Sequence, residues 1–188
     1  RGDQAAANAL SGTLEKDMFV AAGLPDPSDL RYYGFARLDY SPTLTFVNAP
    51  ATRAFLGVPD AHVYTQICND DVAAALGAEA MTSVVHLLPP LLAAGVRVLY
   101  FNGNFDYTID TPGVAKMLYA LDWPHRAAFA AANTTVWKDA DGDAGAGAVA
   151  GYWTTAHGLT LVVATQAGHM VAQDQPSRSL QLITHFVD

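Results

Sequence analysis

The chain contains a single cysteine, Cys68. A lone cysteine excludes an internal disulfide framework and any zinc site built from several cysteines, although it can still pair with a cysteine of another chain. The sequence also opens at Arg1, with no initiator methionine and no signal-peptide pattern, as expected of a processed polypeptide. From these two features we expect the chain to be a piece of a larger protein.

Basic residues are scarce. Ten Lys and Arg residues stand against eighteen Asp and Glu residues, which gives a formal net charge of −8. The order of the sequence does not gather the ten basic residues into a patch. Because nucleic-acid binding depends on a concentrated positive surface, we expect no nucleic-acid partner.

Long hydrophobic runs are missing as well. The longest apolar stretch, residues 84–101, is interrupted by His86, by two prolines and by Arg97, so the sequence predicts no membrane-spanning segment. Nevertheless 51% of the residues are hydrophobic and only 15% are charged, which excludes a disordered chain. A length of 188 residues suffices for one domain with a sizeable core.

The second half of the sequence alternates strand and helix patterns. Residues 96–101 and 159–165 are short apolar runs, typical of strands buried on both faces of a sheet. Residues 134–138 and 149–155 predict a hairpin, and residues 174–187 predict an amphipathic helix. This alternation favours an α/β fold, with a mostly parallel sheet and flanking helices.

The remaining pattern is helical. Residues 1–22 are rich in Ala and predict a helix, which the proline cluster at residues 24–29 ends with a hinge. We expect further helices at residues 51–57, 70–81, 83–94 and 112–121.

Two loops follow the predicted strands and contain chemically useful side chains. Residues 102–110 contain Asp106, and residues 166–176 contain His169. In α/β sheets, catalytic groups collect beyond the carboxyl ends of the strands. An aspartate from one such loop can orient a histidine from the next for general-base catalysis. We therefore predict that Asp106 and His169 form a catalytic pair.

Both loops carry extended motifs that resemble those of the serine carboxypeptidases, a family with the α/β-hydrolase fold. Residues 100–106, Tyr-Phe-Asn-Gly-Asn-Phe-Asp, resemble the family's Gly-Asp-x-Asp loop, whose second aspartate is catalytic and corresponds to Asp106. Residues 168–176, Gly-His-Met-Val-Ala-Gln-Asp-Gln-Pro, resemble its Gly-His-Met-Val-Pro-x-Asp-Gln-Pro loop. This match places the catalytic histidine at His169.

The resemblance covers about residues 47–187. It implies that residues 47–188 are the carboxyl-terminal portion of one α/β-hydrolase domain, preceded by a helical and loop insertion at residues 1–46. It also implies that Met170 lines the substrate pocket beside the histidine. We predict a second substrate-binding position at Asp110, where the family usually has Asn. Two further departures are Asn104 and Ala172, where the family usually has Asp and Pro.

The catalytic serine is missing. None of the six serines lies in a Gly-x-Ser-x-Gly elbow, and the family's Gly-Glu-Ser-Tyr motif is absent. Some family members are cut into two chains that remain associated. The resemblance therefore implies that the serine lies on a separate amino-terminal chain, which is disulfide-linked to Cys68. It also implies that part of the hydrophobic surface of the present chain faces that partner chain.

The activity implied by the resemblance is hydrolysis of carboxyl-terminal peptide bonds in peptide substrates. Two alternatives remain: a related acyltransferase or hydroxynitrile lyase, and a noncatalytic subunit. The sequon at Asn133 predicts glycosylation, and the family implies a secreted, vacuolar or lysosomal protein. The other histidines lack the spacing of a metal site, so we expect neither a metal nor a cofactor, and no membrane partner.

Overall fold

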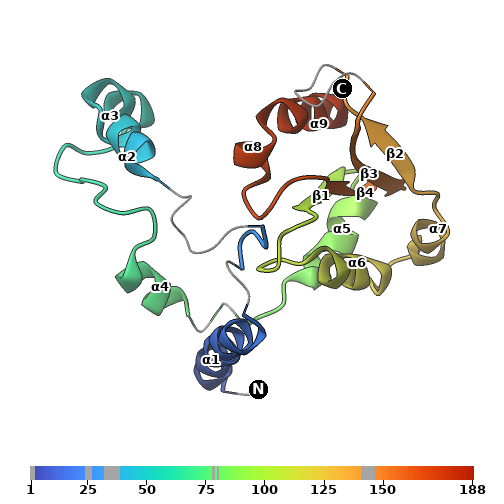
Figure 1. Cartoon of the computed structure of the whole chain (residues 1–188), viewed down its shortest axis with the longest axis horizontal. Helices are drawn as coiled ribbons and strands as arrows, with labels where there is room; N and C mark the ends of the chain where they lie inside the picture. The colour runs from blue at the N-terminus through green and yellow to red at the C-terminus, as the bar shows by residue number, and fades with distance from the viewer. Residues whose placement is uncertain (1–2, 24–26, 32–38, 78, 80, 141–146) are drawn as a thin grey trace. The chain divides into compact units, whose positions relative to one another are not determined.

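The computed structural model describes residues 3–23, 27–31, 39–77, 79, 81–140 and 147–188 (Figure 1). The chain divides into two compact units. One unit comprises residues 1–18 and 34–82, and the other comprises residues 19–33 and 83–188. Two predicted features, the middle of the proline cluster at residues 24–26 and the front of the hairpin loop at residues 141–146, lie outside the described residues.

The first unit contains helices whose ends follow from the local sequence. These are most of α1 (Gln4–Ala22), α2 (Ser41–Asn48), α3 (Pro50–Leu56) and α4 (Asp70–Leu76). α3 ends at Gly57, whose φ of 68° suits a residue without a Cβ. α4 begins after Asn69, whose side chain accepts a hydrogen bond from the Val72 N–H. The helices predicted at residues 1–22, 51–57 and 70–81 are confirmed, the last in a shorter form, whereas α2 was not predicted.

The second unit is built on a sheet that has four strands over the described residues, in the order β1-β4-β3-β2. The strands are β1 (Val98–Gly103), β2 (Thr135–Lys138), β3 (Val149–Ala156) and β4 (Leu159–Ala164). β1 and β4 pair in parallel, with Tyr100 opposite Leu161 and Gly103 opposite Ala164. These two strands correspond to the predicted apolar runs, and they end at the same edge of the sheet.

The other strand pairs are antiparallel, which corrects the expectation of a mostly parallel sheet. β3 and β4 are joined by only His157 and Gly158, whose φ values are 50° and 83°. A two-residue connection reverses the chain and therefore permits only antiparallel pairing. β2 and β3 form the predicted hairpin. The sheet within this chain is thus mixed.

Helices flank both faces of this sheet (Figure 1). They are η2 (Val85–Leu87), α5 (Leu88–Ala93), α6 (Thr111–Tyr119), α7 (Arg126–Ala130), α8 (Val171–Asp174) and α9 (Pro176–Val187). Leu159 of β4 packs in a core with Leu118 of α6 and Phe129 of α7, all fully buried. Ala164 points to the opposite face, because side chains alternate along a strand, and packs there with Val171 of α8. The helices predicted at residues 83–94, 112–121 and 174–187 are confirmed, the first divided into η2 and α5 and the last as α9. α8 was not predicted and lies in the stretch predicted as a loop.

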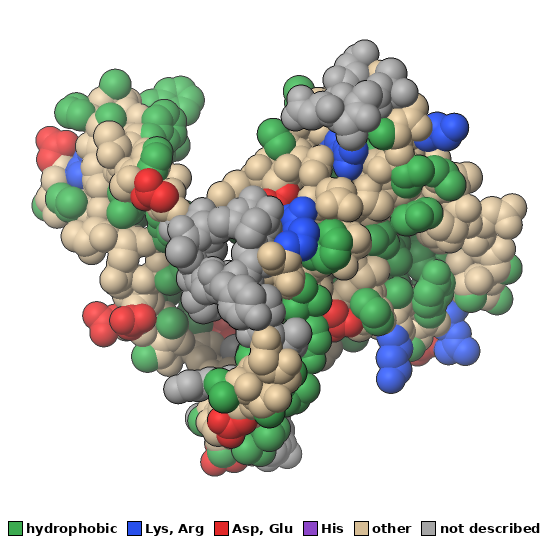
Figure 2. Space-filling view, in the orientation of Figure 1, with side chains coloured by type: hydrophobic (Ala, Val, Ile, Leu, Met, Phe, Trp, Pro, Cys, Tyr) green, Lys and Arg blue, Asp and Glu red, His purple; other side chains and the backbone are tan. Residues whose placement is uncertain are grey.

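None of the helices in the described ranges is both long and apolar enough to cross a membrane. Figure 2 shows that Lys and Arg side chains are scattered over the displayed face and do not gather into a patch.

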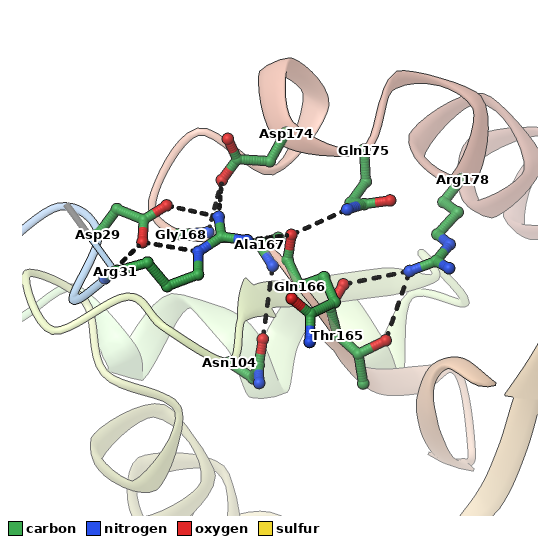
Figure 3. Close-up of polar contacts among 10 residues, drawn as sticks. All are labelled: Asp29, Arg31, Asn104, Thr165, Gln166, Ala167, Gly168, Asp174, Gln175 and Arg178. Atoms are coloured by element: carbon green, nitrogen blue, oxygen red, sulfur yellow. Dashed lines mark hydrogen bonds and ion pairs between the residues drawn. The ribbon is translucent and has the colours of Figure 1, made fainter. Parts of the chain in front are cut away.

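A buried ion pair joins α9 to the residue that follows β2. Arg178 Nε lies 2.8 Å from Asp139 Oδ2, and both side chains are almost completely buried. Asp139 Oδ1 also accepts a hydrogen bond from Gln181 Nε2 at 3.0 Å. Arg178 Nη1 donates to the Thr165 carbonyl, just beyond β4, at 3.3 Å (Figure 3). One guanidinium therefore connects α9, the hairpin and the end of β4.

Removal of this guanidinium is expected to destabilise the fold, because it breaks a buried ion pair. We predict that Arg178→Met lowers the free energy of unfolding by about 3–5 kcal/mol, measured by urea denaturation of the intact protein. Arg126→Met makes the same change at an exposed position of α7 and should cost no more than about 0.5 kcal/mol. Equal effects of the two substitutions would contradict the proposed importance of the buried pair.

Candidate active site

Two loops leave the same edge of the sheet because β1 and β4 are parallel neighbours. We call residues 102–110, which include the end of β1, the aspartate loop. We call residues 166–176, which follow β4, the histidine loop. The predicted catalytic residues Asp106 and His169 lie one on each loop. The topology alone therefore brings them to one place in the fold.

Backbone hydrogen bonds hold the two loops together. The Asn104 N–H donates to the Ala164 carbonyl at 3.0 Å, and the Phe105 N–H donates to the Ala167 carbonyl at 2.9 Å. The Asn104 side chain accepts in return from the Ala167 N–H at 3.4 Å (Figure 3). The sheet ladder thus continues one step into the loops and fixes their spacing.

The loops approach each other so closely that Gly103 cannot carry a side chain. A Cβ placed on Gly103 would lie less than 3.0 Å from the backbone carbonyls of Ala167 and Gly168. Since real Cβ atoms do not approach other atoms so closely, a larger residue would force the loops apart. Gly103 belongs to the motif at residues 100–106, and the close contact with the histidine loop explains why this position requires glycine.

Asp106 and His169 form a direct hydrogen bond. His169 Nδ1 lies 3.0 Å from Asp106 Oδ2. The aspartate side chain is 3% exposed, whereas the histidine side chain is 40% exposed. An ionised carboxylate can only accept, so the hydrogen bond favours the imidazole tautomer with the proton on Nδ1, in which Nε2 has a lone pair. The pair therefore has the arrangement of an orienting carboxylate and a general base that remains accessible.

A backbone group of the aspartate loop binds the Asp106 carboxylate at the oxygen that does not face His169. The Ile109 N–H donates to Asp106 Oδ1 at 3.0 Å, so both carboxylate oxygens are hydrogen-bonded. Asn102 Nδ2 in turn donates to the Ile109 carbonyl at 2.7 Å and closes the loop on itself. A buried carboxylate whose lone pairs are satisfied in this way is held in one orientation.

A third segment, residues 27–31, contacts both loops and was not predicted to take part in the site. The Pro27 carbonyl accepts hydrogen bonds from the N–H groups of Tyr107 and Thr108, both at 3.0 Å. The Ser28 carbonyl accepts from the His169 N–H at 2.7 Å. The available signal was a pair of opposite charges two residues apart, Asp29 and Arg31, in a segment that otherwise predicts only a turn.

Two further predicted positions also lie in this unit. Met170 follows His169 directly, and its side chain is exposed. The Asp110 side chain caps α6 by accepting a hydrogen bond from the Gly113 N–H at 2.6 Å. This cap gives Asp110 a local structural use. A substrate-binding role for Met170 and Asp110 stays a prediction.

The remaining predicted sites are exposed. Cys68 is a free, exposed cysteine in the first unit. Asn133 is exposed in the connection between α7 and β2 of the second unit. Across the part of the chain that the structure describes, no group of three or more His, Cys, Asp or Glu side chains could hold a metal ion.

Comparison with known proteins gives consistent similarities. The family model Peptidase_S10, described as serine carboxypeptidase, matches residues 13–188. The probable serine carboxypeptidase CPVL of Dictyostelium discoideum is 29% identical over 143 residues, 76% of this chain and 27% of that protein. The pheromone-processing carboxypeptidase kex1 of Talaromyces stipitatus is 32% identical over 122 residues, 64% of this chain and 19% of that protein. The chain thus spans between about a fifth and a quarter of the length of these relatives.

A solved structure shares the fold. Kex1(Δ)p, a prohormone-processing carboxypeptidase from Saccharomyces cerevisiae, matches with a TM-score of 0.66 at 21% sequence identity. The match covers 88% of this chain and 37% of that one.

The contact between the two loops yields a stability prediction. Gly103→Ala should lower the free energy of unfolding by about 1–3 kcal/mol, the usual effect of overpacking, measured by urea denaturation of the intact protein. Gly12→Ala on α1 is the matched control, because an added Cβ there meets nothing within 4 Å. In a helix this substitution should be neutral or stabilising by up to about 1 kcal/mol. A Gly103→Ala protein as stable as the wild type would show that the loops can separate freely.

Proposed function

Because this chain belongs to the serine carboxypeptidase family, we propose that it supplies the aspartate and histidine of a carboxypeptidase catalytic triad whose serine lies outside these 188 residues. The observation that carries the proposal is the 3.0 Å hydrogen bond between His169 Nδ1 and Asp106 Oδ2. The predicted α/β-hydrolase fold is confirmed by the likeness to the yeast carboxypeptidase. Within that fold, the order aspartate then histidine along the chain is the one that follows the serine.

In this proposal, His169 acts as the general base and general acid through Nε2. The serine Oγ attacks the carbonyl carbon of the last peptide bond while Nε2 takes the hydroxyl proton. The imidazolium then gives that proton to the nitrogen of the departing amino acid, the C–N bond breaks, and an ester to the serine remains. Water then hydrolyses the ester: Nε2 takes a proton from the water, and the water oxygen adds to the ester carbon. The bond between this carbon and the serine oxygen breaks, the serine oxygen takes the proton back from Nε2, and the shortened peptide leaves with a new terminal carboxyl group.

Asp106 supports these steps through the other ring nitrogen. Its hydrogen bond keeps the proton on Nδ1, so that Nε2 is available to the serine. Its negative charge stabilises the imidazolium each time Nε2 is protonated. The side chain is almost completely buried, which strengthens this electrostatic interaction because water screens it little.

Several features of the second unit support a catalytic domain completed from outside the chain. Among the described residues β1 is an edge strand, so its outer backbone edge can pair with a further strand. A groove of about 640 Å³ between β2 and α9 contains neither Asp106 nor His169. Large hydrophobic side chains around β1 and the aspartate loop are exposed: Leu87, Leu91, Phe101, Tyr107 and Ile109. We place the serine and most of the substrate pocket on the part of the enzyme that covers this surface.

We further propose that this part is a separate amino-terminal chain linked through Cys68. The exposure of Cys68 and the absence of a second cysteine in the sequence support an interchain disulfide. Met170, exposed beside the histidine, and Asp110 at the start of α6 would then contact the bound peptide. The exposed sequon at Asn133 supports N-glycosylation and a secreted, vacuolar or lysosomal location.

Loss of the catalytic pair should abolish turnover. In the intact enzyme, we expect His169→Ala and Asp106→Asn each to lower kcat for a blocked dipeptide by about 10⁴-fold. The reason is that the first variant has no base and the second favours the wrong tautomer. His86→Ala, at an exposed position on η2, should retain the wild-type rate. Activity retained by His169→Ala would refute the assigned role.

The two-chain arrangement is tested by intact mass spectrometry of the native protein after treatment with a fluorophosphonate probe. Without reduction we expect one species that contains this chain and a labelled second chain. Reduction should release an unlabelled chain that contains this sequence, glycosylated at Asn133. A probe attached to a polypeptide continuous with Asp188 would contradict the two-chain proposal, and an unmodified Asn133 would contradict glycosylation. Absence of any labelled serine would contradict the proposed enzyme.

A further inference from the structure

We propose that Arg31 is a positioning residue, which holds the histidine loop in the one arrangement where His169 meets Asp106. This inference rests on the proposed function of that pair. The contacts that carry this inference join Arg31 to neighbours of Asp106 and His169, not to these two residues themselves. It acts through the backbone and side chains on both sides of the histidine.

The Arg31 guanidinium binds the histidine loop at two points. Nη1 donates to the Gln166 carbonyl at 2.9 Å, and Nη2 donates to Asp174 Oδ2 at 3.0 Å (Figure 3). Gln166 precedes His169 by three residues, and Asp174 follows it by five. One rigid, planar group therefore clamps both ends of the segment that carries the base.

The clamp continues directly to the residue before the histidine. Asp174 Oδ2, the atom that accepts from Arg31, also accepts from the Gly168 N–H at 2.7 Å. A Cβ on Gly168 would lie less than 3.0 Å from the Ser28 carbonyl oxygen and from Asp29 Cβ. The histidine loop is thus pressed against residues 28–31, and the His169 N–H is fixed there by its bond to the Ser28 carbonyl.

The start of the histidine loop requires such support because its backbone is strained. Gln166 has a φ of 58°, in the left-handed region that residues with a Cβ rarely adopt. Its carbonyl oxygen accepts from Arg31 Nη1 at 2.9 Å and from Gln175 Nε2 at 2.8 Å (Figure 3). These two donors stabilise a peptide orientation that the local sequence alone does not favour.

Charge explains why an arginine is needed at this position. The Asp29 and Asp174 side chains are 8% and 5% exposed, and both carboxylates are bonded to the same Nη2 of Arg31, Asp29 at 2.6 Å. Two carboxylates this close repel each other unless a cation lies between them. Without Arg31, this repulsion would act on Asp174 and through it on Gly168.

Arg31 also reaches the aspartate loop. Its guanidinium carbon lies 4.9 Å from the centre of the Phe105 ring, and the neighbouring Leu30 N–H donates to the Phe105 carbonyl at 3.1 Å. Phe105 immediately precedes Asp106. Residues 28–31 therefore contact the residue before each member of the pair. Arg31 contacts Phe105 directly and reaches Gly168 through Asp174.

The test compares two arginine substitutions in the intact enzyme. Arg31→Met should lower kcat for a blocked dipeptide by about 10–100-fold, because a displacement of about 1 Å at the base is enough for such a loss. KM should change by less than about twofold, because a positioning role affects the chemical step and not uniform substrate binding. Arg178→Met removes a buried arginine that holds the neighbouring Thr165, and it should lower stability while leaving kcat within about twofold at a temperature where the protein is folded.

Two readouts separate positioning from general loss of structure. Guanidinium ion added to Arg31→Ala should restore part of kcat, and it should not raise the activity of Arg178→Ala or of the wild type. In ¹⁵N-histidine spectra of the intact protein, the Nδ1 proton bonded to Asp106 should be visible in the wild type, lost in Arg31→Met and retained in Arg178→Met. This spectroscopic readout needs no catalytic activity, so it tests the role of Arg31 even if the proposed hydrolysis is not observed.

An Arg31→Met enzyme with wild-type kcat, or with an unaltered Nδ1 proton signal, would show that the loop does not need the clamp. A loss of kcat equal to that of Arg178→Met would assign Arg31 to stability alone. If Arg31→Met does not fold, Asp174→Asn keeps the size of the side chain and removes its charge, and it should lower kcat and weaken the same signal. A wild-type kcat in folded Asp174→Asn would equally contradict the proposal.

Discussion

The parallel pairing of β1 with β4 is the constraint on which the rest of the site depends. It ends both strands at one edge, so that the loops carrying Asp106 and His169 leave the sheet side by side. The hydrogen-bond ladder then extends to Asn104, and the space it leaves beside the other loop admits only a glycine at position 103. The 3.0 Å hydrogen bond between His169 and Asp106 follows from this spacing and not from any contact between neighbours in sequence.

This acidic chain also buries several carboxylates, whose negative charge must be compensated. Three sets of buried carboxylates lie around the two loops, and each has its own compensation. Asp106 is bonded to His169 and to a backbone N–H, Asp29 and Asp174 share Arg31, and Asp139 is paired with Arg178. Two of the ten basic residues, Arg31 and Arg178, are therefore placed beside buried carboxylates, whose charge they compensate. The ionic contacts connect the loops to residues 28–31, α8 and α9.

Local sequence patterns predicted the parts of the fold that depend on local physics. The apolar runs predicted β1 and β4, the proline and glycine positions predicted α3, and the two loop motifs predicted that Asp106 and His169 lie close together. The mixed character of the sheet was not predicted, because an apolar strand pattern does not distinguish parallel from antiparallel neighbours; the two-residue turn at His157 decides it. Arg31 was missed for another reason. It lies 135 residues before Gln166, and no local pattern indicates that contact.

The most direct test of the account is a crystal structure of the intact enzyme after reaction with a fluorophosphonate. The account predicts phosphorus on a serine outside these 188 residues, with its Oγ within about 3.2 Å of His169 Nε2 and the Nδ1 bond to Asp106 intact. It also predicts that the part bearing this serine covers the apolar surface around β1. An adduct on one of the six serines of this chain, or a labelled serine far from His169, would contradict the central claim that this chain contributes two members of a shared triad.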